Sequence, residues 1–206
     1  MDLKTCLKLL REIKSVTFGT VDEFGNPQVR IIDIMCVSED NLYFLTARGK
    51  NFYKELLNQK KVGISGLTKD YQAIRINATT KKLDNSEKYI DKMFINNPSM
   101  NEVYPGVSRS ILEAFTLDNG EVEFFDLSQS PIHRETFSLN RGNISLKGFC
   151  ISDECISCGT CYDICPQNAI KEEDHYNISQ ENCLHCGLCF ENCPSSAIYK
   201  RSDFKC

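Results

Sequence analysis

The sequence predicts an α+β protein of two domains, a small β-barrel domain followed by a compact cysteine-rich domain. Three observations predict this. Hydrophobic residues alternate between the strand and helix periods through about the first two thirds of the chain. Ten of the twelve cysteines lie in the final third, and eight of them repeat at regular spacings. A chain of 206 residues also fits two domains on the usual size of a domain. We place the domains at 1–142 and 143–206.

The chain begins with an expected amphipathic helix. Leu3, Leu7, Leu10 and Ile13 recur near the helical period, and the β-branched pair Val16-Thr17 follows them. A helix therefore covers the start of the first domain and presents one apolar face to it.

A series of strands with two further helices is expected after this helix. The turn-forming residues at 22–27 and 38–41 separate the first three strands, and Asp118-Asn119-Gly120 is expected to close a hairpin. The expected strands cover 15–21, 28–37, 42–46, 62–67, 71–83, 111–117 and 121–127, and the helices cover 50–58 and 86–96. Six or seven strands with two or three helices suggest a small barrel.

The strongest motif is a cysteine run that occurs twice, with its copies 28 residues apart. Each copy reads Cys-x2-Cys-x2-Cys-x3-Cys-Pro, which is the run of bacterial two-cluster ferredoxins, where the fourth cysteine of each run ligates the other cluster. The copies are Cys155, Cys158, Cys161, Cys165 and Cys183, Cys186, Cys189, Cys193. One 4Fe–4S cluster is then expected on Cys155, Cys158, Cys161 and Cys193, and the other on Cys183, Cys186, Cys189 and Cys165.

Structural zinc and disulfides are the alternatives for these cysteines. A zinc site needs only four ligands, fewer than the two complete runs supply. The chain shows no apolar signal segment and no membrane-length apolar stretch, so we expect a cytoplasmic, reduced protein without disulfides. The cysteines outside the runs are expected to be small buried residues: Cys6, Cys36, Cys150 and Cys206.

The acidic charge is concentrated in the second domain. Residues 143–206 contain nine acidic and five basic residues, whereas the preceding segment has nineteen of each. An acidic surface suits docking to a basic electron-transfer partner. It argues against nucleic-acid binding, which requires a basic stripe on the protein. We therefore expect a low-potential electron-donor protein as a partner, and neither nucleic acid nor a membrane.

The first domain resembles the pyridoxamine 5'-phosphate oxidase-like FMN-binding split β-barrels over roughly 3–128. The resemblance is carried by the segments 18–30, 42–51 and 73–78, which read FGTVDEFGNPQVR, LYFLTARGKN and AIRINA. It implies an FMN-binding split β-barrel followed by a small ferredoxin-like α+β iron–sulfur domain. It also implies a homodimer with FMN at the subunit interface.

The candidate flavin-binding residues follow from chemistry and from this resemblance. The FMN phosphate is dianionic and needs Arg or Lys donors, for which Arg30 and Lys50 are the first choices. The resemblance places the strand that begins at Arg30 under the flavin ring. Arg48 and Asn51 can equally be solvated loop residues. Arg75 is read as a barrel-rim charge paired with an acidic residue, with a role at the flavin of the other subunit as the alternative. The full set is Arg30, Ile31, Ile32, Asp33, Thr46, Arg48, Lys50 and Asn51.

The chain also departs from this family. True pyridoxamine phosphate oxidases carry a C-terminal tryptophan and an Arg-x-His pair that grip the substrate, but this chain has no tryptophan, and the cysteine runs occupy that region. Vitamin B6 oxidation is therefore not expected, and no catalytic residue is identified.

Fusion of both carriers suggests a flavin and iron–sulfur oxidoreductase. Electrons would pass between the two 4Fe–4S clusters and FMN, in either direction, and from FMN to a small acceptor such as a nitro compound, a quinone or a flavin-like molecule. The alternative is a non-enzymatic electron carrier or redox sensor that binds FMN or haem. A deazaflavin in place of FMN also stays open.

Overall fold

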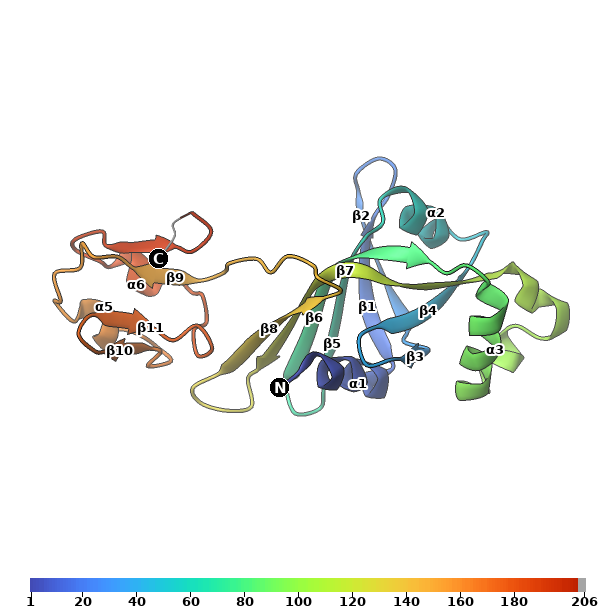
Figure 1. The fold of residues 1–206 in the computed structure, drawn as a ribbon, viewed down its shortest axis with the longest axis horizontal. Coiled ribbons are helices and arrows are strands. Elements are labelled where there is room, and N and C mark those ends of the chain that lie inside the picture. The colour runs from blue at the N-terminus through green and yellow to red at the C-terminus, as the bar shows by residue number, and fades with distance from the viewer. Residues whose placement is uncertain (204–206) are drawn as a thin grey trace. The chain divides into compact units, whose positions relative to one another are not determined.

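The computed structural model describes residues 1–203, which form two compact units (Figure 1). The first unit contains 1–69, 73–123 and 136–144. The second contains 70–72, 124–135 and the chain from 145 onward. The α+β class predicted from the sequence is confirmed, with a curled antiparallel sheet in the first unit.

The helix α1 (Leu3–Ile13) begins the first unit as predicted. The side chain of Asp2 accepts a hydrogen bond from the backbone N–H of Thr5 at 2.7 Å, which satisfies one of the free donors of the first turn. Cys6, Leu7 and Leu10 are fully buried. The apolar face of α1 is therefore part of the core.

The sheet has the strand order β2-β1-β5-β6-β7-β4-β3, and β8 pairs with β7. Its curl forms a half-barrel (Figure 1). Phe18 and Phe44 fill the interior with ring centroids 4.9 Å apart, and Phe44 stacks on Phe115 at 5.8 Å. The strands are β1 (Ser15–Val21), β2 (Pro27–Asp33), β3 (Cys36–Val37), β4 (Leu42–Ala47), β5 (Lys61–Leu67), β6 (Gln72–Lys82), β7 (Leu112–Asp126) and β8 (His133–Leu139).

Helices cover parts of this sheet. The predicted helices are confirmed as α2 (Asn51–Asn58) and α3 (Ser86–Asn96), and α4 (Met100–Val103) with the 3-10 turn η1 (Gly106–Ile111) follows them. Met93 and Phe94 of α3 pack in one buried cluster with Met35 and Ala114. This packing fixes α3 beside β4 and β7.

Two predictions for the strands are wrong. The expected hairpin at Asp118-Asn119-Gly120 does not form, because β7 runs through these residues without a turn. Gly120 instead lets β7 approach β6 closely, because a Cβ at this position would lie 2.3 Å from the carbonyl oxygen of Asn77. The turn comes later, at 127–132, and leads into the unpredicted β8. The strand expected over 28–37 is also interrupted, between β2 and β3.

The Gly120→Ala substitution should destabilise the protein by about 1–3 kcal/mol, the usual cost of overpacking, because the new methyl group overlaps backbone atoms of β6. Chemical denaturation followed by far-UV circular dichroism measures this loss. Gly49→Ala is the matched control, since nothing lies within 4 Å of a Cβ built there. Equal stabilities of the two variants would contradict the close approach at Gly120.

From residue 145 onward, the second unit is built from very short elements. The strand β9 (Phe149–Ile151) pairs with β12 (Ile198–Lys200), and β10 (Ile170–Glu172) pairs with β11 (Tyr176–Ile178). The one-turn helices are α5 (Thr160–Asp163) and α6 (Leu188–Glu191).

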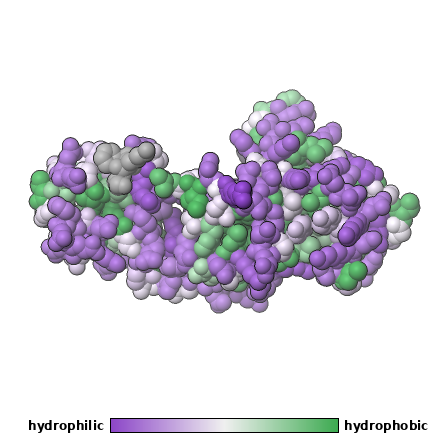
Figure 2. Space-filling view, in the orientation of Figure 1, coloured by the Kyte–Doolittle hydropathy of each residue, from purple (hydrophilic) through white to green (hydrophobic). Residues whose placement is uncertain are grey.

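Hydrophilic residues cover most of the visible face of the molecule (Figure 2). No helix within 1–203 is long and apolar enough to cross a membrane.

The cysteines outside the runs are placed mostly as expected. Cys6 is buried and Cys36 is half-buried, and both are free thiols. Cys150 is buried but disulfide-bonded, so the expectation of a chain without disulfides is wrong for this residue. Sequence spacing could not reveal this bond because only the fold brings two thiols together. Cys206 lies outside the described residues.

Candidate functional site

The eight cysteines of the two runs converge on two cavities in the second unit. Each of the two cavities is lined by four of these cysteines. The first cavity, here called the N-cavity, is lined by Cys155, Cys158, Cys161 and Cys193. The second, the C-cavity, is lined by Cys183, Cys186, Cys189 and Cys165. In both cavities the fourth cysteine comes from the opposite run, in the grouping that the sequence predicts.

The loops that carry the cysteines follow the same backbone path in both runs. Ser157 and His185, 28 residues apart, have φ values of 55° and 60°. Gly159 and Gly187 precede α5 and α6 with φ values of 76° and 84°. These left-handed residues turn each loop tightly enough for its cysteines to face one cavity.

Backbone N–H groups point at four of the eight sulfur atoms. The N–H of Ser157 donates to Cys155 Sγ at 3.4 Å, and that of His185 donates to Cys183 Sγ at 3.3 Å. The N–H groups of Ala169 and Ala197 donate to the sulfurs of Cys165 and Cys193, both at 3.3 Å. Hydrogen bonds of this kind favour the thiolate, which is the form that ligates iron.

The spacing of the sulfur atoms separates a cluster site from a zinc site. Among residues 1–203, no three His, Cys, Asp or Glu side chains gather closely enough to hold one metal ion. A zinc ion draws four ligands to about 2.3 Å from a single point. A 4Fe–4S cluster takes one thiolate at each of four separate irons, so its ligands stand farther apart. Both cavities therefore fit clusters better than zinc.

The thiols differ in their environment. Burial raises the pKa of Cys161 and Cys183, and it raises that of Cys189 to about 11. The hydrogen bond with the Thr160 hydroxyl lowers the pKa of Cys158. Burial alone would raise the pKa of Cys193, but hydrogen bonds from Ser195 and Ala197 lower it overall. Both lowered thiols line the N-cavity.

The β2 candidates for flavin binding lie at an edge of the sheet. Arg30 Nη1 lies 2.7 Å from Glu55 Oε2 and 2.6 Å from Thr20 Oγ1, and its guanidinium stacks over the Phe52 ring. Ile31 is 63% exposed, Ile32 is half-buried, and Asp33 accepts a hydrogen bond from Ser15 at 2.6 Å. Arg30 is thus held by an internal ion pair that sequence reasoning missed.

Replacing Arg30 with methionine should destabilise the protein by about 3–5 kcal/mol, because Glu55 would remain as a buried charge without its partner. The double variant Arg30→Met/Glu55→Leu should regain most of this loss. Urea denaturation of the flavin-free protein measures both. Unchanged stability of the single variant would instead leave Arg30 free to serve a ligand.

The second group of candidates lies where β4 meets α2. Thr46 is 3% exposed, and its hydroxyl is buried without a hydrogen-bond partner among the described residues. Arg48 Nη1 lies 3.2 Å from Glu113 Oε1. Lys50 precedes α2 and is exposed, and Asn51 is the first residue of that helix. The unpartnered Thr46 hydroxyl is a polar group that a ligand or a water molecule would satisfy.

Arg48 also lines a cleft of about 780 Å³ beside the start of α3. Its lining has three more cations, and it has three carboxylates: Lys82, Lys88 and Arg109, with Asp84, Glu87 and Glu113. Burial by itself would raise the pKa of Glu113, but the hydrogen bond from Arg48 and the charge of Lys82 lower it overall. We call this the cationic cleft. Its lysines and Arg109 carry no motif, which is why the sequence did not indicate them.

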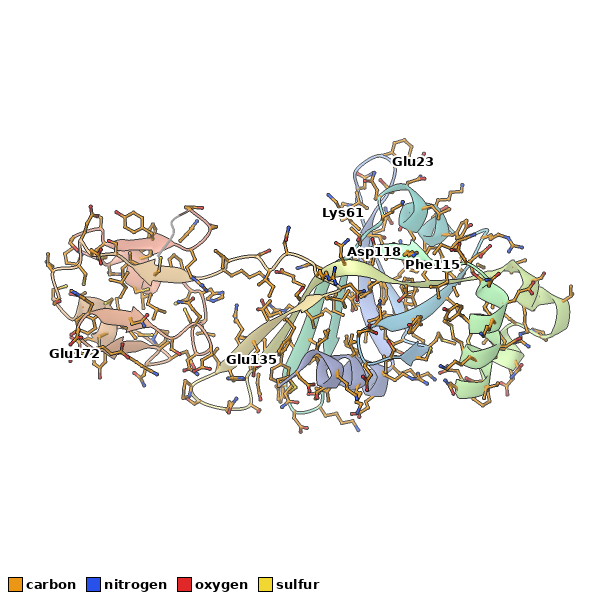
Figure 3. The ribbon with its side chains drawn as sticks, in the orientation of Figure 1. Glu23, Lys61, Phe115, Asp118, Glu135 and Glu172 are labelled. Carbon is orange, nitrogen blue, oxygen red and sulfur yellow. The ribbon has the colours of Figure 1, made fainter. Side chains whose placement is uncertain are left out.

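A second cavity of the barrel is acidic. It has a volume of about 210 Å³, and its lining includes Asp22, Glu23, Glu55, Lys54 and the predicted Asn51. Figure 3 shows Glu23 on the turn between β1 and β2, on the α2 side of the barrel. Three carboxylates disfavour a phosphate here. Carboxylates outnumber cations in the cavity that Asn51 lines, whereas the cationic cleft has four cations and three carboxylates.

One further prediction for the barrel can be checked directly. Arg75 Nη1 lies 3.2 Å from Glu123 Oε1, and Glu123 is 4% exposed at its side chain. The interpretation of Arg75 as a barrel charge paired with an acidic residue is confirmed.

Comparisons with known proteins agree with both units. The 4Fe-4S dicluster domain family matches residues 154–197. Among solved structures, a NimC/NimA family protein from Clostridium acetobutylicum is 27% identical, with a TM-score of 0.57, and the match covers 66% of this chain and 92% of that chain. General stress protein 26 from Bacillus anthracis is 16% identical, with a TM-score of 0.52, and the match covers 68% of this chain and 100% of that chain.

A protein related to general stress protein 26, also from Clostridium acetobutylicum, is 14% identical, with a TM-score of 0.52 and coverage of 68% and 98%. The last two likenesses show the fold alone. A search of curated proteins found no match. The pyridoxamine 5'-phosphate oxidase family matches residues 3–108, just over half of the chain. The chain therefore belongs to the pyridoxamine 5'-phosphate oxidase family, and it joins that flavin-binding fold to a 4Fe–4S dicluster domain in one redox protein.

Proposed function

We propose that the protein is an oxidoreductase that passes electrons between two 4Fe–4S clusters and FMN, and from FMN to a small acceptor. The acceptor class is a nitro compound, a quinone or a flavin-like molecule. The observation that carries this proposal is the pair of four-cysteine cavities in the same chain as a flavin-family barrel. Two clusters hold one electron each, which together equal the two electrons that a bound flavin supplies as hydride equivalents.

The chain's own residues would hold the clusters in a defined way. Each cavity offers four cysteines, and backbone N–H groups already point at half of the sulfurs. In this proposal Cys155, Cys158, Cys161 and Cys193 ligate one cluster, and Cys183, Cys186, Cys189 and Cys165 ligate the other. The acidic second domain suits a basic, low-potential donor protein.

A second copy of the chain is the proposed partner at β2. Val29 and Ile31 are 71% and 63% exposed, and both lie on this edge strand. An exposed apolar stripe on an edge strand is a natural surface for pairing with another chain. A homodimer would cover the stripe beside the residues that the family resemblance assigns to the flavin.

Arg48 is the proposed anchor for the flavin phosphate, with Lys50 as its neighbour on the same loop. Arg48→Ala should weaken FMN binding by about 10- to 100-fold, the usual range for a lost hydrogen bond to a charged group, while riboflavin binding should change little. Fluorescence titration of flavin-free protein measures both affinities. Lys54→Ala, in the acidic cavity, is the control with unchanged FMN affinity. Equal loss for FMN and riboflavin would contradict a phosphate contact.

The composition of the anaerobically purified protein tests the proposal as a whole. We expect one flavin with about eight iron and eight sulfide per chain, the content of two four-iron clusters. Clusters without flavin would reject the FMN assignment and favour a carrier that binds haem. Flavin that is reduced without turnover of any acceptor would favour a non-enzymatic carrier or sensor.

A further inference from the structure

The two cluster cavities differ in their side-chain hydrogen bonds, although the cysteine runs repeat. Thr160 Oγ1 lies 3.4 Å from Cys158 Sγ, and Ser195 Oγ lies 3.6 Å from Cys193 Sγ. The two sulfurs come from different runs, yet both line the N-cavity. Two hydroxyl groups therefore serve a single cavity.

The matching positions of the other cavity carry no hydroxyl. The counterpart of Thr160, 28 residues later, is Leu188, and the counterpart of Ser195, 28 residues earlier, is Gln167. Within 1–203, no side-chain hydroxyl lies within hydrogen-bond distance of Cys186 or Cys165. Backbone N–H groups donate to sulfur in both cavities, from Ser157 and Ala197 in the N-cavity and from His185 and Ala169 in the C-cavity. The hydroxyl pair is thus a specific difference between two otherwise similar sites.

The direction of these hydrogen bonds is fixed once iron is bound. A cysteine that ligates iron has lost its proton, so the Thr160 and Ser195 hydroxyls must donate. Reduction adds one negative charge to the cluster and its sulfurs. Donors to those sulfurs stabilise the reduced form more than the oxidised form, which raises the reduction potential.

We propose that Thr160 and Ser195 tune the cluster of the N-cavity by raising its reduction potential, and that they make the two clusters inequivalent. This inference rests on the ligand sets proposed above. It assigns a role to two residues that contact neither substrate nor iron and act through the ligands Cys158 and Cys193.

The C-cavity has a different neighbour, a fixed positive charge. Arg134 Nη1 donates to His185 Nδ1 at 2.6 Å, and its guanidinium lies over the Phe125 ring. The charge of Arg134 acts on Cys183, against the larger effect of burial. The order of the two potentials depends on this charge as well as on the hydroxyls. The test therefore measures how each potential shifts in a variant.

Anaerobic potentiometric titration of the full-length protein, followed by electron paramagnetic resonance, resolves the two clusters. Thr160→Val and Ser195→Ala should both lower the reduction potential of the same cluster. The reduction potential of the other cluster should stay unchanged in both variants. The expected size is about tenfold in the reduction equilibrium for each lost hydrogen bond, or about 59 mV for a one-electron couple. Thr160→Ser should keep the wild-type value.

A variant that adds a hydroxyl keeps the proposal testable if the variants that remove one fail to assemble their cluster. Leu188→Thr adds a hydroxyl at the C-cavity on a residue that is 39% exposed, so the fold should tolerate it. This variant should raise the reduction potential of the C-cavity cluster and leave that of the N-cavity cluster unchanged. Potentials that do not move, or that move together, would overturn the tuning role. A wild-type protein with fewer than two clusters would instead reject the proposed ligand sets.

Discussion

The Cys165→Ser variant should lose about half of its iron and sulfide, and the loss should come from the cluster of the opposite run. Cys165 follows Cys155, Cys158 and Cys161 in the sequence, but its side chain lines the cavity of Cys183. Serine is a poor ligand for iron compared with a thiolate, so the C-cavity should lose its cluster. Iron and sulfide analysis of anaerobic protein measures the loss.

Double variants identify which cluster is lost. Cys165→Ser/Cys183→Ser should lose no more iron than Cys165→Ser alone, because both residues serve one cavity. Cys165→Ser/Cys155→Ser should lose nearly all iron, because the two residues serve different cavities. Cys36→Ser, outside both runs, is the control with full iron content. The opposite pattern in the double variants would mean that each run holds its own cluster.

Removal of iron should unfold the second unit and leave the barrel folded. The core of the second unit is small, and its buried residues include three of the proposed ligands, Cys161, Cys183 and Cys189. Between 145 and 203 its strands have three residues each and its helices four. Elements this short cannot stabilise a domain without the cluster bonds, so metal binding and folding are coupled.

Hydrogen–deuterium exchange before and after chelation measures this effect. Peptides from 145–203 should lose almost all protection, whereas those from 15–67 should keep it because the sheet and the phenylalanine core remain. Reconstitution with iron and sulfide should restore protection of the second unit. Loss of protection in both regions, or in neither, would contradict independent folding of the barrel.

Local patterns in the sequence predicted most of the first unit. The strand β1 and the helix α3 match the expected ranges because their periodicity and their flanking turns are local signals. The error at Gly120 has a different cause. Asp118-Asn119-Gly120 has the composition of a turn, but Gly120 is needed where β7 approaches β6, and this contact cannot be seen locally.

The candidate sites also differ in whether a local sequence pattern or only the folded chain brings their residues together. The cysteines of the two cavities share one spacing, so the sequence predicted their grouping across the two runs. The cationic cleft draws Arg48, Lys82 and Arg109 from separate elements, and no spacing connects them. Glu55 is 25 residues from Arg30, and its ion pair with that residue appears only after α2 packs on the sheet.

Electron transfer between the clusters and the flavin tests the central claim most directly. Anaerobic stopped-flow mixing with a one-electron donor should reduce the clusters first, and flavin absorbance should then fall as the clusters are reoxidised. The cluster-free variant Cys155→Ser/Cys165→Ser controls for direct reduction of the flavin and should show slow loss of flavin absorbance. The account predicts two cluster electrons for each flavin reduced. Flavin that stays oxidised beside fully reduced clusters, or that is reduced as fast without them, would contradict it.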